Sequence, residues 1–240
     1  QNNVQGAADM GAAPGLVTGY QRLLDPAVRS RIASVWGAEL PTEIGLTTTE
    51  MLDAAVSGHI RALWLQGEDV VQSDPFESRT IKALECLDFL IVQDPFFSET
   101  ARYADVVLPA TTTLENEGTY TNGERRIQRV VPALEAPGEA RQDWIITRDI
   151  ANALGANWVY QCPADVMKEI AEIAPALFGG ITYERLTHDG IQWPCPDRTH
   201  PGTAAVHADA FLRGKGKLTC IPYRPSPDTT SPESPFSLLT

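Results

Sequence analysis

Polar or small residues follow three apolar runs of the sequence, at the points where each run ends. The runs cover 60–66 (IRALWLQ), 89–93 (FLIVQ) and 104–110 (ADVVLPA). The residues at their ends are Gln66, Gly67, Glu68 and Asp69, then Gln93 and Asp94, and then Pro109, Ala110 and Thr111. Carboxylates and amides in such places can hydrogen-bond ribose hydroxyls or the N–H groups of a guanine base. One such end alone indicates only a turn, but three together predict a site for a nucleotide-like ligand.

Two helical segments separate the three runs. Asp74-Pro75 predicts the start of the first, which continues with helical spacing to Leu87, and Ser98 predicts the cap of the second. This alternation predicts an α/β fold with a βαβαβ unit, whose parallel, Rossmann-like sheet gathers the strand ends at one edge. Ser73 would place a hydroxyl beside a helix N-terminus, where phosphate binds. The alternative is that Ser73 and Asp74 only cap the helix.

Helices are also predicted before and after this unit. Asp25-Pro26 opens one that runs to about Trp36, and the capping-box spacing of 47–50 (TTTE) opens another, which stops at Gly58.

Asp143 predicts the N-cap of a further helix, and Pro163 predicts the start of the next. The chain beyond them is mostly irregular, with a strand predicted at 217–223. Five prolines in 222–235 indicate an extended connector.

The stretch 118–128 (GTYTNGERRIQ) allows two interpretations that are compatible with each other. Arg125 and Arg126 could clamp a pyrophosphate or pair with acidic groups. Asn122-Gly123 is the strongest short signal for a hairpin turn.

Charge and composition exclude several classes of protein. The 240 residues carry 31 acidic against 19 basic side chains, a net charge of −12, which argues against nucleic acid as a partner. No apolar stretch is long enough for a transmembrane span. The cysteines form no CxxC pair, the histidines lack metal-ligand spacing, and no GxSxG motif occurs, so neither a metal site nor a catalytic centre is expected within the chain. The lack of an initial Met predicts a piece of a longer protein.

Several segments occur in one order that is similar to a known family. They are QNNVQGAADMG, RALWLQGEDVVQSDP, LIVQDPFFSETARYADVVLPATTTLENEGTYTNGERRIQ, QDW, ITYERL, GIQWPCP and FLRGKGKL. Together they resemble the catalytic (alpha) subunit of molybdenum- or tungsten-dependent formate dehydrogenases, within the molybdopterin oxidoreductase superfamily. The resemblance covers nearly the whole chain.

The resemblance implies that the parent enzyme oxidises formate to CO2 and two electrons at one Mo or W held by two molybdopterin guanine dinucleotides. It also implies an iron–sulfur cluster in an N-terminal part and iron–sulfur or flavin/NAD electron-transfer subunits as partners. The cysteine pattern fits a reducing compartment, and we expect a cytoplasmic location. The chain would comprise a cofactor-binding α/β domain at 1–112, a cofactor-cradling loop and helical segment at 113–220, and a Pro-rich linker at 221–240.

Site residues follow from the same resemblance. Gln1 matches a glutamine that contacts a pterin dinucleotide near the metal, and Asp143 matches a contact on the guanosine side. The other matched positions at the strand ends are Asp69, Ser73, Gln93 and Ala110. Weaker candidates nearby are Gly67, Glu68, Asp94, Asn122 and Arg125.

The four cysteine contexts do not match the Cys- or selenocysteine-His metal ligand of the family, and the family's catalytic arginine would precede Gln1. No catalytic residue or metal ligand is therefore expected here. Two alternatives are another bis-guanine-dinucleotide oxidoreductase, such as a nitrate reductase, and a non-catalytic relative, such as the large iron–sulfur subunit of respiratory complex I. The presence of three residues argues against the non-catalytic relative, because a protein that has lost the metal site does not need them: Asp69, Gln93 and Asp143.

Overall fold

The computed structural model describes residues 3–187, 189–211, 214–226 and 229–237, so Gln1 lies outside the described residues. The chain divides into two units, Gln1–Ala204 and Ala205–Thr240. Among the described residues, none of the helices combines the length and the apolar character needed to cross a bilayer.

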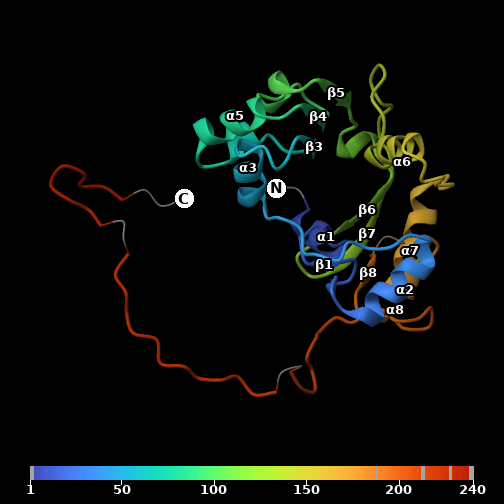
Figure 1. Cartoon of the computed structure of the whole chain (residues 1–240). Coiled ribbons are helices and arrows are strands. Elements are labelled where there is room, and N and C mark those ends of the chain that lie inside the picture. The colour runs from blue at the N-terminus through green and yellow to red at the C-terminus, as the bar shows by residue number, and fades with distance from the viewer. Residues whose placement is uncertain (1–2, 188, 212–213, 227–228, 238–240) are drawn as a thin grey trace. The chain divides into compact units, whose positions relative to one another are not determined.

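A three-stranded parallel sheet lies at the centre of the first unit's α/β part (Figure 1). Its strands are β3 (Ala62–Gln66), β4 (Phe89–Asp94) and β5 (Val106–Pro109), in the order β3-β4-β5. Gln66 pairs with Gln93, and Asp94 pairs with Pro109. The predicted parallel α/β unit is therefore confirmed, and its strands end at one edge of the sheet.

One face of this sheet is packed against short helices. They are α4 (Val70–Ser73), α5 (Glu77–Glu85) and the 3-10 turn η1 (Thr100–Tyr103). The buried residues of this core are Val70, Val71, Leu84, Leu90, Val92 and Ala101. Because alternate residues of a strand point to opposite faces, Leu90 and Val92 of β4 both reach this core.

The start predicted for the helix after β3 is wrong. Asp74 is extended (ψ 133°), which is the conformation that a residue before proline prefers, and its carboxylate accepts a hydrogen bond from the amide of Phe76 (2.9 Å). The chain therefore forms a turn at Asp74-Pro75, and α5 begins two residues after Pro75.

An antiparallel sheet is formed by β6 (Gly118–Thr121), β7 (Arg126–Val130) and β8 (Ile191–Gln192). Asn122 Oδ1 accepts hydrogen bonds from the amides of Glu124 (2.9 Å) and Arg126 (3.0 Å), which closes the turn between β6 and β7. The hairpin interpretation of Asn122-Gly123 is therefore confirmed.

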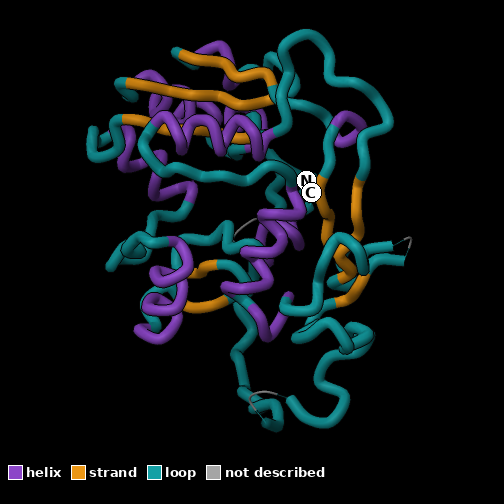
Figure 2. The backbone as a smooth tube through the Cα atoms, turned by 90° about the vertical axis from the view of Figure 1, so that its right-hand side faces the viewer, coloured by secondary structure: helices purple, strands orange, loops and turns teal. Residues whose placement is uncertain are grey.

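The other elements complete the first unit (Figure 2). They are β1 (Leu16–Val17), β2 (Gln21–Arg22), α2 (Pro26–Trp36), α3 (Thr48–Val56), η2 (Thr113–Glu115), α6 (Asp143–Ala153), α7 (Pro163–Ile173) and α8 (Pro175–Phe178). The starts predicted for α2, α3 and α7 are confirmed. Asp143, however, is the first helical residue of α6 and not its cap, a position that Gln142 takes.

The first helix, α1 (Val4–Asp9), is tied to two distant parts of the chain. Asn3 Oδ1 accepts a hydrogen bond from the amide of Thr121 in β6 (3.2 Å). Asp9 is fully buried and accepts a hydrogen bond from Trp193 Nε1 (2.6 Å), 184 residues further on. The fold thus joins α1 to segments that follow it much later in the chain.

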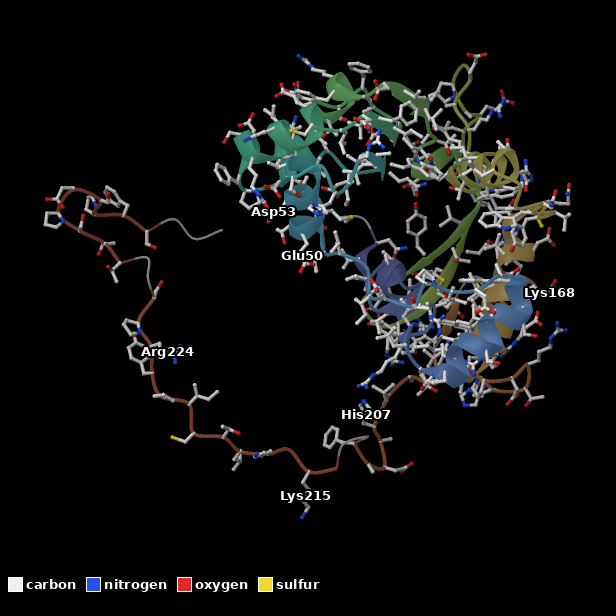
Figure 3. The ribbon with its side chains drawn as sticks, in the orientation of Figure 1. Glu50, Asp53, Lys168, His207, Lys215 and Arg224 are labelled. Carbon is white, nitrogen blue, oxygen red and sulfur yellow. The ribbon has the colours of Figure 1, made fainter. Side chains whose placement is uncertain are left out.

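The second unit has no helix or strand among its described residues. The strand predicted at 217–223 is therefore wrong: Leu218 is 99% exposed and Ile221 is 80% exposed. A strand is stabilised by pairing and by burial of one face, and neither is available to these residues. Figure 3 shows Lys215 and Arg224 on this irregular backbone.

Candidate cofactor-binding site

The ends of β3 and β4 meet the first turn of α6. Gln93, the penultimate residue of β4, is fully buried, and its Nε2 donates a hydrogen bond to Asp143 Oδ1 (2.7 Å) across 50 residues of sequence. Gln66 at the end of β3 approaches both Gln93 Oε1 and Thr147 Oγ1 with its Nε2, at 3.4 Å each. Thr147 Oγ1 in turn donates to the carbonyl of Asp143 (2.8 Å). We refer to Gln66, Gln93, Asp143 and Thr147 as the amide relay.

The relay leaves one carboxylate oxygen of Asp143 available. Among the described residues, no hydrogen bond reaches Asp143 Oδ2, and the side chain is only partly buried. The position in the first turn of an 11-residue helix favours a negative charge, because the helix dipole is positive at this end. Asp143 can therefore accept hydrogen bonds from N–H groups of a ligand.

Asp69 has a different set of partners, which lie in the loop and turn after β4 except for the backbone of Gln72 in α4. Its carboxylate accepts hydrogen bonds from the amide of Thr100 (3.0 Å), from the Thr100 hydroxyl and from the amide of Glu99 (3.2 Å). Burial acts to raise the pKa of Asp69, but these hydrogen bonds together lower it below the ordinary value. Asp69 therefore fixes the end of β3 against η1 as an ionised group.

The other predicted residues at the strand ends lie close by in the chain. Ser73 donates a hydrogen bond to the carboxylate of Glu68, and both side chains are exposed. Gly67 has a positive φ of 62°, which favours glycine, and nothing lies within 4 Å of the position that a Cβ would take. This part of the sheet edge is consequently open.

Asp94 and Ala110 lie on the next two strand ends. Asp94 Oδ1 accepts a hydrogen bond from the amide of Phe96 (2.8 Å), and its carbonyl accepts one from the amide of Ala110 (3.2 Å). Ala110 is buried and also forms a parallel bridge with Arg141, just before α6. The backbone at Ala110 thus joins β5 to the segment that carries Asp143.

Arg125 and Arg126 are engaged by protein groups of the first unit. Arg125 donates to the carbonyls of Trp193 and Thr203, the latter at 3.1 Å, and its guanidinium lies 5.3 Å from the centre of the Trp193 ring. Arg126 donates to the carbonyl of Asp189 and to Gln192 Oε1, at 3.0 Å each. The contacts of both arginines, like those of Asn122, hold the β6–β7–β8 sheet and the 193–204 segment together.

Thr100 and Thr147 were not identified from the sequence, and Gln66 was placed at a strand end but was not predicted as a site residue. Gln66 ends an apolar run in the way that Gln93 does, and Thr147 lies one helical turn after Asp143, on the same face of α6. These two signals could have indicated the relay. Thr100 follows a loop, and its contact with Asp69 depends on how that loop folds.

A hollow of about 770 Å³ lies beside α6. Arg141 and Arg148, which both line it, pair with Asp149 through contacts of 3.4 Å and 2.8 Å. Elsewhere in the described part of the chain, no three His, Cys, Asp or Glu side chains come together in a group that could hold a metal ion.

Known proteins are similar to this chain along its whole length. The family described as Molybdopterin oxidoreductase matches residues 1–153. The F420-dependent formate dehydrogenase subunit alpha of Methanocaldococcus jannaschii is 44% identical, and the match covers 100% of this chain and 36% of that protein. For the F420-dependent formate dehydrogenase 2 subunit alpha of Methanococcus maripaludis the identity is 42%, with the same two coverages.

A further relative is Probable oxidoreductase YjgC of Bacillus subtilis, 47% identical over 80% of this chain and 20% of that protein. Among solved structures, acetylene hydratase from Pelobacter acetylenicus matches with a TM-score of 0.50 and 19% identity, covering 66% of this chain and 22% of that chain. The structural match supports the fold alone. The family match covers more than half of this chain, and the chain therefore belongs to the molybdopterin oxidoreductase family.

Proposed function

We propose that this chain is the cofactor-holding part of a formate dehydrogenase alpha subunit, which oxidises formate to CO2 and two electrons. Two relatives that align over 100% of the chain are named formate dehydrogenase alpha subunits, although the chain spans only 36% of their length. The observation that carries the proposal is the amide relay, which presents Asp143 at the shared edge of the sheet.

The residues present fit a guanine dinucleotide. Guanine offers two adjacent donors, N1–H and the N2 amino group, which a carboxylate such as that of Asp143 can accept. The open edge at Gly67 gives the dinucleotide room, while Asp69 holds the adjacent loop in place. The fully buried Gln93 donates a hydrogen bond to the carboxylate of Asp143.

Other residues complete the proposed site, most of them at the strand ends. We propose that they contact or border the same cofactor with their side chains or their backbone, Gln93 with its backbone only: Gln1, Gly67, Glu68, Asp69, Ser73, Gln93, Asp94, Ala110, Asn122 and Arg125. Among these, Asn122 and Arg125 act mainly by fixing the β6–β7 turn and the 193–204 segment. Gln1 is proposed on the family resemblance alone.

When bound, the molybdopterin-held Mo or W supplies the redox chemistry, taking up the two electrons of formate. The residues of this chain bind and orient the dinucleotide, and they contribute neither metal ligand nor catalytic group. The proposal includes a second dinucleotide, an iron–sulfur cluster and electron-transfer subunits in the whole enzyme. It also places the enzyme in the cytoplasm, in keeping with four cysteines that are all free.

The test uses the purified parent enzyme. Acid hydrolysis of the cofactor should release guanine nucleotide, and elemental analysis should find Mo or W in the same fractions. Asp143→Ala should lower both contents together while the circular dichroism spectrum is unchanged. A parent enzyme that contains no guanine nucleotide would refute the proposal.

A further inference from the structure

The direction of every hydrogen bond in the amide relay can be worked out from its members. The Thr147 hydroxyl donates to the carbonyl of Asp143, so its oxygen can only accept from Gln66 Nε2. The same Nε2 faces Gln93 Oε1, which leaves Gln93 Nε2 to face Asp143. An ionised carboxylate can only accept hydrogen bonds, so this orientation of Gln93 is the one that satisfies all members.

Both polar atoms of the Gln93 side chain are thus used inside the protein, and the side chain has no exposed surface. Such a group cannot reach a ligand at the sheet edge. It can, however, restrict its neighbour: a buried, charge-assisted hydrogen bond of 2.7 Å fixes the rotation of the Asp143 carboxylate. With Oδ1 held by Gln93, Oδ2 is the atom left to face a ligand.

We infer that Gln93 is a positioning residue that makes the site selective for guanine by orienting Asp143, and that Gln66 and Thr147 set the orientation of Gln93. The inference rests on the proposed function, because it assigns the roles within that same site. In this orientation Oδ2 accepts from one of the two guanine donors, N1–H and the N2 amino group, and Oδ1, which keeps a second lone pair, can accept from the other. Adenine would bring its N1, an acceptor, against the carboxylate, and two acceptors that face each other form no hydrogen bond.

An exchange of the two side-chain types tests this inference in the parent enzyme. Gln93→Glu alone sets two carboxylates against each other. Asp143→Asn alone keeps the hydrogen bond to Gln93, but the new amide then turns its NH2 group towards the donors of guanine. In the double variant the new carboxylate at 93 accepts from the new amide at 143, whose oxygen again faces guanine. With ionised carboxylates, the pair carries the same net charge in the wild type and in the double variant, whereas Gln93→Glu alone adds one negative charge and Asp143→Asn alone removes one.

The measurement is the amount of guanine nucleotide retained per polypeptide after purification. Each single variant should retain at least about tenfold less than the wild type, the loss expected for one charge-assisted hydrogen bond. The double variant should recover to within about threefold of the wild type, because the acceptor is restored. Gln128→Glu is the matched control, because Gln128 is exposed on β7 and makes no side-chain hydrogen bond among the described residues. This variant should retain as much guanine nucleotide as the wild type.

A second variant keeps the test decisive if Gln93→Glu does not fold. Gln66 is exposed, so Gln66→Met removes the restraint on the Gln93 amide without burying a charge. Retention should then fall by about two- to fivefold, since each contact that is lost is a long one.

The outcomes separate the inference from the proposed function. A wild-type enzyme that holds guanine nucleotide, together with a double variant no better than the single variants, overturns the inference and leaves the proposed function standing. Unchanged retention in Gln93→Glu or in Gln66→Met overturns it as well. A wild-type enzyme without guanine nucleotide overturns both.

Discussion

Asp69 shows how a single residue of the site also contributes to stability. Three hydrogen bonds from Thr100 and Glu99 are made to its ionised form, and they lower its pKa in the folded chain although burial opposes the change. A group whose pKa is lower in the folded than in the unfolded state stabilises the fold above its unfolded pKa. That contribution disappears as the pH falls through the lowered value.

We therefore expect Asp69→Asn to lower the free energy of unfolding by about 1 kcal/mol at neutral pH, after allowance for screening by solvent. The difference from the wild type should shrink as the pH falls below about 4, the ordinary value for aspartate. Urea unfolding at several pH values measures it. A difference in the free energy of unfolding that stays constant below about pH 4 would contradict this expectation. The control is Asp74→Asn, because the Asp74 carboxylate accepts a hydrogen bond from one backbone amide only.

The candidate residues at the strand ends could be found from the sequence because an apolar run that stops at a polar residue marks the end of a strand. The hydrogen-bond partners of these residues could not be found in the same way. The hydrogen bond from Gln93 to Asp143 spans 50 residues, and no local pattern encodes a contact at that distance. Arg125 illustrates the same limit, since its carbonyl partners Trp193 and Thr203 follow 68 and 78 residues later.

At the level of elements, β8 depends on one backbone position. Gly190 has a φ of 63°, and a Cβ built there would lie 2.3 Å from the carbonyl oxygen of Ile127 in β7. Both the backbone conformation and the close approach of β7 therefore require glycine. The pair Ile127–Ile191 belongs to the register that joins β8 to β7.

Gly190→Ala should destabilise the chain by about 2–4 kcal/mol, from the strained conformation and the overlap with β7. Gly123→Ala, at the exposed turn between β6 and β7 where nothing lies within 4 Å of the added carbon, should change stability by less than about 1 kcal/mol. Thermal unfolding of both variants provides the comparison. Equal effects at the two positions would mean that the approach of β7 to Gly190 is unimportant.

Elements with local start signals were predicted well, and those that depend on a partner were not. A proline at the first helical position or a capping box acts within one turn, so the starts of α2, α3 and α7 follow from neighbouring residues. β8 is only two residues long and exists through its pairing with β7, which the sequence did not indicate. The segment 217–223 is the reverse case: its residue types favour a strand, but among the described residues it has no partner strand.

At the scale of the molecule, we propose that the chain binds a cofactor and that the reacting groups belong to other parts of the parent enzyme. The described residues contain no group of three His, Cys, Asp or Glu side chains that could hold a metal ion. The purified chain alone should therefore show no formate-dependent reduction of a dye, with the parent enzyme as the positive control. Measurable reduction by the chain would show that reacting groups are present in it.

The attachment of α1 also bears on the order in which the chain folds. The buried carboxylate of Asp9 accepts hydrogen bonds from two nearby side chains, Gln5 and Tyr20, at 2.8 Å each, and from Trp193, which a ribosome adds 184 residues later. Until Trp193 is present, Asp9 has only its nearby partners, and this contact cannot hold α1 against the later segment. The β3–β4–β5 sheet can form earlier, because the residues that it pairs are far closer in sequence. During synthesis the pairing of β3, β4 and β5 can therefore be complete before α1 is fixed to Trp193, so the register of this sheet does not depend on the first helix.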